Sequence, residues 1–314
     1  MEKASEIYLK QKQKRTTWQD YKKHKSLILM ALPLLIYFAI FHYGPIYGLL
    51  IAFKDFYPTK GILASDWVGL EHFKTMFQGL YFWPVLKNTI INSSYNLIFG
   101  FPAPILLAIL LNEVSSRRFK KVIQTVTYFP HFISWVVLAG IVYEMLSPSR
   151  GPINILLSWL GFEPIFFVAN VRWFRTVLVG SNIWKEIGWG SIIYLAAITN
   201  IDPTLYEVAK IDGANRLQRI FYITLPGIAN VVVIMLIFAV GKIINDNFDQ
   251  IFNLMNNQVM QVADVISTYT YREGIKEMNY GYATAVGLFK NTISFIFVMG
   301  ANWLAQKMGQ ETLF

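Results

Sequence analysis

The sequence predicts an all-α, polytopic membrane protein, and its composition, apolar stretches and charge distribution all support that fold class. Of the 314 residues, 54% are hydrophobic and only 15% are charged, whereas soluble domains carry about 25% charged residues. Six apolar stretches are long enough for a helix to cross about 30 Å of hydrocarbon. Eight Lys and Arg residues lie at or before the start of the first stretch. We therefore expect a basic cytoplasmic tail at residues 1–25 and a six-span membrane domain at residues 26–314.

The apolar stretches place the transmembrane helices along the chain. We expect them at residues 26–53, 87–111, 122–146, 174–199, 227–246 and 282–306. The first contains Pro33 and the Gly44-Pro45 pair, which favour a kink or an interfacial turn. Pro130, His131 and Glu144 interrupt or border the third.

The distribution of Lys and Arg predicts the orientation of these helices. With the N-terminus inside, the inner segments carry sixteen Lys and Arg residues and the outer segments carry seven. Positive charge favours the cytoplasmic side, so we expect both termini in the cytoplasm. The net charge of +9 therefore indicates membrane orientation rather than nucleic-acid binding.

Several kinds of chemistry find no support in the sequence. The chain has no Cys, which excludes a disulfide framework, a thiolate metal site and a Cys nucleophile. Its four His residues lack metal-ligand spacing, and no Ser/His/Asp set or pair of carboxylates indicates catalysis. We assign no catalytic residue and no metal ligand.

The cytoplasmic loop at residues 200–226 is the most informative segment. Asp202 can cap a helix that begins at Pro203, and Gly213 can end that helix in a left-handed turn. A second helical stretch follows, with Leu217, Ile220 and Phe221 on one face, and Pro226 opens the fifth span. A short amphipathic helix pair of this kind can lie in a groove of a partner protein. It can equally be a connector that packs only against its own helices.

A family resemblance favours the first interpretation. The loop carries Glu207-Val208-Ala209, then Asp212-Gly213, and ends in Leu225-Pro226. This pattern resembles the coupling motif of binding-protein-dependent ABC importer permeases, with Val208 in place of the first Ala of Glu-Ala-Ala. The resemblance extends from about Leu27 to the C-terminus. It is closest to the carbohydrate-uptake branch, on residues 128–135, 264–272 and 282–290.

The resemblance implies the partners of the chain. In such importers the coupling helix sits in a cleft of a cytoplasmic ATPase, so the implied ATPase contacts are Glu207, Ala209, Asp212, Gly213, Leu225 and Pro226. The chain contains no G-x-x-x-x-G-K-[ST] loop. We therefore expect no cofactor in this chain, with ATP and Mg²⁺ bound by a dimer of separate ATPase subunits. A second homologous permease and an extracytoplasmic sugar-binding protein are the other implied partners, in a bacterial cytoplasmic (inner) membrane.

Polar residues inside the spans suggest where a solute could bind, because a charged side chain within a bilayer is energetically costly and usually has a function. In the fourth span Asn182, Lys185, Glu186 and Trp189 share one helical face. Other polar or aromatic candidates lie in the second span (Asn92, Tyr95) and the fifth (Lys242, Asp246). The alternative is that Lys185 with Glu186, or Lys242 with Asp246, form pairs that only fix helix packing, and that the Asn residues bond between helices.

The family resemblance again favours a substrate site. Positions 182, 185, 186, 189 and 242 resemble those lining the sugar site of the larger maltose-type permease. Here Lys185, Glu186 and Lys242 place charge where that permease has apolar or small groups. Two Lys residues suggest acidic sugar units such as uronates, although Glu186 and Asp246 can neutralise them. For the outer loop at residues 247–281, a surface helix at the membrane interface and docking of the binding protein both remain open.

The sequence thus predicts a transmembrane permease subunit, not an enzyme, of an ATP-driven carbohydrate importer that works by alternating access. Its expected substrate is an oligosaccharide, and the two Lys residues suggest that it contains uronates. Two other classes remain as alternatives. An ion-coupled secondary transporter would use Glu186 or Asp246 as a proton relay. A membrane-embedded enzyme would require a catalytic cluster at a membrane face.

Overall fold

The computed structural model describes residues 24–307 and residue 309, so most of the predicted basic tail at 1–25 lies outside the described residues. The chain divides into two units, Met1–Val68 and Gly69–Phe314, and each is described by itself. The described residues are mainly helical, and their only strands are β1 (Lys54–Asp55) and β2 (Asp66–Trp67). The predicted all-α class is confirmed.

In the first unit, a single run of helix covers the first predicted span. It comprises α3 (Lys25–Phe38), the π-helix η1 (Ala39–Tyr43) and the 3-10 helix η2 (Gly44–Phe53). Its 29 residues are long enough to cross a membrane, and an 18-residue window within them has a mean hydropathy of 2.0. The helix type changes at the Gly44-Pro45 pair, where Pro45 lacks an N–H for the backbone ladder.

The rest of the first unit is a small folded segment. The strands β1 and β2 pair antiparallel, with Lys54 opposite Trp67, and α4 (Gly61–Ala64) lies between them in the sequence. The Lys54 ammonium donates to the carbonyls of Leu63 and Ser65, which fixes the connection.

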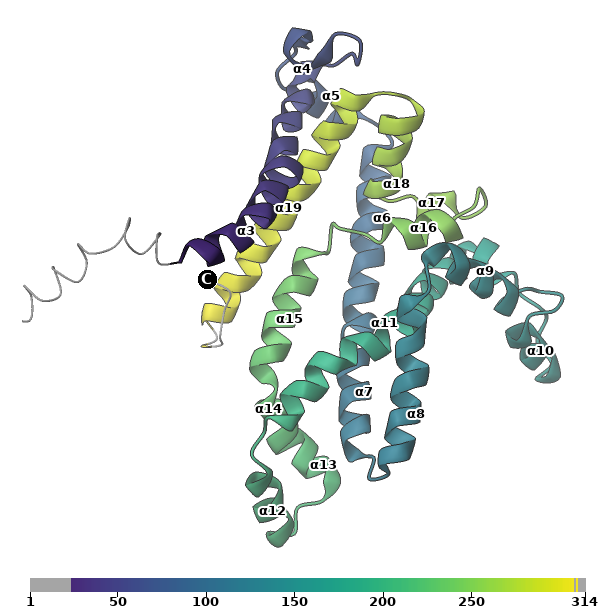
Figure 1. Cartoon of the computed structure of the whole chain (residues 1–314). Helices are drawn as coiled ribbons and strands as arrows, with labels where there is room; N and C mark the ends of the chain where they lie inside the picture. The colour runs from purple at the N-terminus through teal and green to yellow at the C-terminus, as the bar shows by residue number, and fades with distance from the viewer. Residues whose placement is uncertain (1–23, 308, 310–314) are drawn as a thin grey trace, which may run out of the picture. The chain divides into compact units, whose positions relative to one another are not determined.

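The second unit contains the remaining helices (Figure 1). Its first half comprises α5 (Glu71–Gln78), α6 (Phe82–Tyr95), η3 (Asn96–Gly100), α7 (Pro102–Glu113), α8 (Arg117–Tyr128), η4 (Phe129–Phe132), α9 (Trp135–Met145), α10 (Pro152–Trp159), η5 (Phe167–Ala169) and α11 (Val171–Thr199). Its second half comprises α12 (Pro203–Ile211), α13 (Arg216–Arg219), η6 (Ile220–Thr224), α14 (Leu225–Gly227), α15 (Ala229–Gly241), α16 (Phe248–Leu254), α17 (Met260–Ala263), α18 (Ile266–Tyr271), η7 (Arg272–Lys276) and α19 (Tyr280–Lys307).

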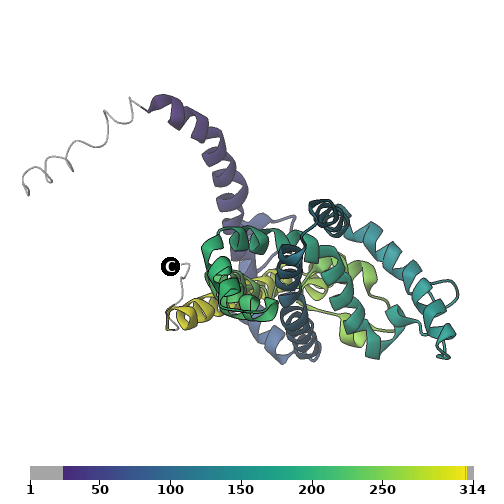
Figure 2. The same cartoon turned by 90° about the horizontal axis from the view of Figure 1, so that it is seen from below.

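The long helix α11 holds the second unit together. It packs against α7, α8 and η4, and it also contacts α6 and α17. A Cβ on Gly188 would lie only 2.1 Å from the Thr127 carbonyl oxygen at the end of α8, so only glycine permits this approach. The loop helices α12 and α13 lie at one end of this unit in Figure 1, and Figure 2 views the unit from that end.

The number of membrane spans is only partly settled by the structure. Among the described residues, Lys25–Phe53, Phe82–Glu113 and Tyr280–Lys307 are long and apolar enough to cross a membrane. Two bent helix pairs also qualify if each pair counts as one span. In the first pair α8 and α9 are bent by 112°, and in the second α13–α14 and α15 are bent by 64°. The predicted fourth span, α11, is long enough in its 29 residues but is not among these. The count of six therefore stays a prediction.

The outer loop at residues 247–281 does not form a surface helix. It folds into the short elements α16, α17, α18 and η7. Ile251 and Leu254 of α16 are buried in a cluster with Leu138 of α9 and Phe174 of α11. The interfacial-helix interpretation is wrong for this segment, because Ile251 and Leu254 pack into the protein core, although Phe252 stays 37% exposed.

Candidate functional site

The loop between α11 and α15 has the local structure that its sequence predicts. The Asp202 carboxylate accepts a hydrogen bond of 2.9 Å from the backbone N–H of Thr204, so it caps α12 at its first residue, Pro203. Hydrogen bonds from Thr204, above all from its backbone N–H, lower the pKa of Asp202 below its ordinary value.

A left-handed glycine ends α12. Gly213 has φ +82°, its N–H donates to Lys210, and the next N–H, of Ala214, donates to Ala209 over 2.8 Å. These two bonds form a Schellman motif, the common way in which glycine ends a helix. Asn215 and Gln218 then form a capping box that begins α13. The loop therefore adopts a defined helix–turn–helix conformation.

The exposed side chains of this loop can meet a partner. Glu207 and Asp212 are exposed, as are the apolar side chains of Leu205, Val208 and Ile211, the last 85% exposed. Leu225 differs from the other predicted contacts, because it packs against the buried cluster around Ile228. The Tyr206 hydroxyl lies 3.0 Å from that of Thr224 and connects α12 to η6. Motion of α12 would therefore reach the helices behind it.

Lys185 of α11 is buried and fully used within the chain. Its ammonium donates to the carbonyls of Pro130, His131 and Ile133, and it lies over the Trp135 ring at 5.5 Å. An ammonium has three N–H donors, so none remains for a substrate in this conformation. The structure gives Lys185 a different role from the predicted one, because it binds the segment that joins α8 to α9. It does not pair with Glu186.

Glu186 and Trp189 form one cluster with η4. The Glu186 carboxylate lies 2.9 Å from Nδ1 of His131, and the His131 ring stacks on Trp189 at 4.5 Å with an interplanar angle of 1°. Phe132 meets the same indole edge-on at 5.7 Å. Phe132 is 71% and Trp189 46% exposed. The cluster therefore presents aromatic surface beside a carboxylate–imidazole pair, which suits the C–H face and hydroxyls of a sugar ring.

A cavity of about 250 Å³ brings together Asn182, Lys242 and Asp246. The Asn182 amide donates to Asn96 of η3 over 3.3 Å. Asp246 accepts hydrogen bonds from the backbone N–H and the hydroxyl of Ser267. Lys242 is exposed and has no ion pair among the described residues. Lys242 thus stays a candidate ligand, whereas Asp246 also anchors α18.

The two candidates on α6 lie apart from this cavity. Asn92 is buried, and its amide donates to the Val262 carbonyl of α17 over 3.3 Å. This bond is the inter-helix contact that the alternative interpretation describes. Tyr95 is 40% exposed and lines a different cavity, together with Arg172 and Arg175.

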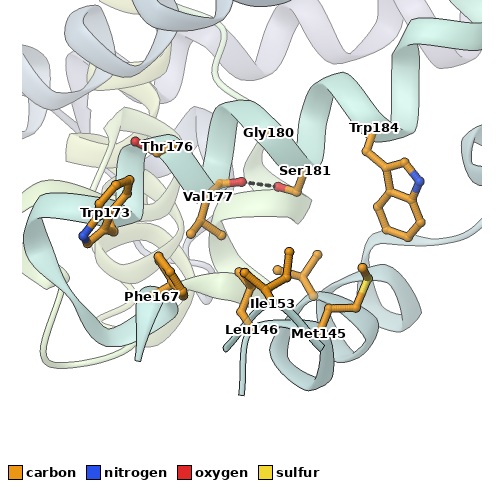
Figure 3. Close-up of a pocket in the computed structure, with 11 residues that line it drawn as sticks. Met145, Leu146, Ile153, Phe167, Trp173, Thr176, Val177, Gly180, Ser181 and Trp184 are labelled. Carbon is orange, nitrogen blue, oxygen red and sulfur yellow. Dashed lines mark hydrogen bonds between the residues drawn. The ribbon is translucent and has the colours of Figure 1, made fainter. Parts of the chain in front are cut away.

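The opposite side of α11 is apolar. A cavity of about 360 Å³ lies between α9, α10 and α11, lined mainly by large apolar side chains that include Leu146, Phe167 and Trp184 (Figure 3). The Ser181 hydroxyl borders this cavity and donates to the Val177 carbonyl of its own helix over 2.7 Å. This surface offers little to a polar solute, so the candidate substrate face is the one that carries Asn182, Glu186 and Trp189.

The sequence interpretation missed His131 and Phe132 as members of the site. Both lie in the Tyr128–Trp135 stretch that carries the family resemblance. The sequence signal was a His followed by a Phe in an apolar span, but the partner of His131, Glu186, is 55 residues away. Residues 24–307 hold no cluster of three or more His, Asp or Glu side chains that could bind a metal ion.

Comparisons with known proteins agree with these features. The family model described as "Binding-protein-dependent transport system inner membrane component" matches residues 100–310. The polygalacturonan/rhamnogalacturonan transport system permease protein YteP of Bacillus subtilis (strain 168) is 46% identical over 308 residues, which are 98% of this chain and 96% of the relative. Protein LplB of the same organism is 44% identical over 93% of this chain and 92% of its own length.

Two solved structures are also similar. One is a bacterial ABC transporter involved in the import of the acidic polysaccharide alginate, with a TM-score of 0.85 and 44% identity over 92% of this chain and 98% of that chain. The other is a bacterial alginate ABC transporter in complex with an alginate pentasaccharide-bound periplasmic protein. Its TM-score is 0.86 at 42% identity, over 94% of this chain and 99% of that chain.

Proposed function

The chain belongs to the family of binding-protein-dependent transport system inner membrane components, and we propose on that premise that it is the permease subunit of an ATP-driven oligosaccharide importer. The observation that carries the proposal is α12. It is exposed, capped at both ends, joined to the helix bundle through Tyr206, and lies inside the matched residues 100–310.

The substrate class follows from the relatives and from the α11 surface. YteP is named for polygalacturonan and rhamnogalacturonan, and the solved relatives import alginate. These names support an acidic oligosaccharide as the substrate of this chain. The stacked His131 and Trp189 rings provide aromatic faces for such a ligand. Asn182, seven residues before Trp189 on α11, lines a cavity with Lys242 and provides polar groups.

The proposed mechanism is alternating access. An extracytoplasmic binding protein delivers the sugar, and a second permease completes the pore. ATP and Mg²⁺ are bound by two separate ATPase subunits, whose closure moves α12, and the Tyr206–Thr224 contact passes that motion to η6 and α15. The Lys and Arg distribution supports this arrangement, because it favours a cytoplasmic location for both termini and α12.

The test is ATP-driven uptake by the purified complex in proteoliposomes, with ATP hydrolysis measured in parallel. Glu207→Ala and Gly213→Pro should lower the amount of sugar transported per ATP while the complex stays folded. Proline requires a negative φ, so it is incompatible with the +82° of Gly213.

Gly161 is a matched control for the glycine variant. It has φ +83° and ends α10 with the same motif, since its N–H donates to Ser158 and that of Phe162 to Leu157. Gly161→Pro therefore introduces the same local strain far from α12 in the sequence. Normal coupling in Glu207→Ala and Gly213→Pro would remove this loop from the mechanism. Uptake driven by a proton gradient without ATP would instead indicate a secondary transporter.

A further inference from the structure

A third cavity beside α11 carries an unbalanced positive charge. It has a volume of about 600 Å³ and lies where α6, α11 and α17 meet. Arg172 and Arg175 from the first turns of α11 line it, together with Tyr95 and Phe99 from α6 and η3. No carboxylate is among its lining residues.

Neither guanidinium is neutralised within the described part of the chain. The four ion pairs found among the described residues involve neither Arg172 nor Arg175. Arg172 is exposed. Arg175 donates from Nη2 to the Asn88 side chain over 3.1 Å, but its Nε is buried and has no partner. Buried donors in folded proteins nearly always have an acceptor, so this one indicates an acceptor that the chain itself does not supply.

The cavity that holds Lys242 provides a contrast. There Asp246 lines the same space as the ammonium, so the charges offset each other. The arginine cavity has no such carboxylate. An uncompensated charge among membrane helices usually marks the path of a ligand or ion. An anion is therefore the ligand that this cavity favours.

The type of anion follows from the geometry of the donors. A guanidinium presents N–H groups in a planar fork that matches a carboxylate with two hydrogen bonds. The aromatic rings of Tyr95 and Phe99, with centroids 6.3 Å apart and 40% and 57% exposed, offer apolar faces beside those forks. A carboxylate carried on a pyranose ring uses both features at once.

We propose that this cavity binds the carboxylate of an acidic sugar unit, with Arg172 and Arg175 as its ligands. The proposal rests on the proposed importer function. It assigns the selection of acidic substrates to Arg172 and Arg175 rather than to Lys185, which the sequence suggested for that role. Arg175 also lies on the same side of α11 as the candidate substrate face. Arg175, Asn182, Glu186 and Trp189 follow at spacings of seven, four and three residues along one side of α11. At 1.5 Å per residue, Arg175 and Trp189 are about 21 Å apart along the axis.

The experiment compares two substrates that differ in charge. ATP-driven uptake by the intact complex is measured with oligogalacturonate and with its methyl ester, which keeps the ring but loses the negative charge. Arg172→Gln is the test variant, because Arg172 is exposed and its loss breaks no described contact. Arg150→Gln is the control, since it removes the same charge from an exposed arginine outside the cavity, paired with Glu144.

We expect Arg172→Gln to raise the KM for the free acid about tenfold, a loss of about 1.4 kcal/mol in binding, and to leave the ester unchanged. Arg172→Lys should fall between wild type and Arg172→Gln, because it keeps the charge but loses the fork. Arg150→Gln should change neither substrate. Equal loss for acid and ester, or no change for the acid, would overturn the proposal.

The outcomes separate this proposal from the proposed function. ATP-driven uptake of a neutral oligosaccharide but not of the acid would retain the importer and overturn the arginine site. Absence of ATP-driven uptake of any oligosaccharide in wild type would overturn the importer function, and the arginine site with it.

Discussion

Replacing Lys185 with methionine tests whether this buried cation supports the fold or contacts the substrate. Methionine keeps a similar length and volume but removes all three donors. The three carbonyl oxygens that accept from Lys185 lie between 2.5 and 3.3 Å from its ammonium. A hydrogen bond to a charged group contributes about 1.5–3 kcal/mol. Burying the ammonium charge is itself unfavourable, so it offsets part of the stabilisation that the three hydrogen bonds provide.

We therefore expect Lys185→Met to destabilise the chain by about 3 kcal/mol, because each buried carbonyl left without a donor costs about 1–3 kcal/mol and removal of the buried charge offsets part of that total. The break between α8 and α9 should be the affected region, since the three carbonyls belong to residues 130–133. The assay is the apparent melting temperature of the purified complex in detergent, where a loss of this size corresponds to at least about 5 °C.

Lys242→Met is the matched control, because the Lys242 side chain is exposed and makes no ion pair or hydrogen bond among the described residues. It should leave the melting temperature within about 1 °C, as surface substitutions usually do. At a temperature where Lys185→Met remains folded, its preference for acidic over esterified sugar should match wild type. An unchanged melting temperature with a selective loss of acidic uptake would refute the structural role of Lys185.

Three further outcomes are expected. Gly188→Ala should sharply reduce the yield of folded protein, because its Cβ would lie 2.1 Å from the Thr127 oxygen, whereas Gly140→Ala should be tolerated because no atom lies within 4 Å. Asp202 has a lowered pKa, so its capping of α12 should be complete above its unfolded pKa of about 3.9 and should be lost as pH falls through the lower folded value. Amide exchange in α12, corrected for intrinsic rates, should then accelerate in that acidic range in wild type but not in the Asp202→Asn variant. Trp189→Ala removes the aromatic stack and should raise the KM for acid and ester alike; an effect on the acid alone would argue against a stacking role.

The coupling loop could be predicted in detail because short-range rules decide its structure. Asp202 before Pro203 gives a helix start, and Gly213 gives a left-handed end. Both depend on residues within a few positions of each other. The helical coverage of 26–53 and 282–306 was likewise predictable, because long apolar runs leave few alternatives in a membrane.

The contacts of the substrate face could not be predicted, because they join distant segments. Lys185 shares a helical face with Glu186, and the sequence cannot show that carbonyls more than 50 residues away satisfy the lysine. The arginine cavity presents the same difficulty. Arg172 and Arg175 lie at the start of a predicted span, and Tyr95 meets them only through the packing of α6 on α11.

The outer loop shows a related limit. Its mixture of apolar side chains with Asn and Gln fits an amphipathic surface helix and a buried segment equally well. Gln250 is buried, and its amide donates to the Leu178 carbonyl over 2.6 Å and to the Ser181 hydroxyl over 2.9 Å. From its residue type, Gln250 would be predicted to be exposed. Its hydrogen bonds to Leu178 and Ser181 allow it to lie in the core instead.

The most direct test of the account is purification of this chain from its native membrane in mild detergent, followed by mass spectrometry of the proteins that accompany it. We expect recovery of an ATPase that carries a P-loop, together with a second permease. Substitution of the exposed α12 residues Val208 and Ile211 with Asp should release the ATPase but retain the second permease. Recovery of this chain alone, from a preparation that preserves other membrane complexes, would contradict the account.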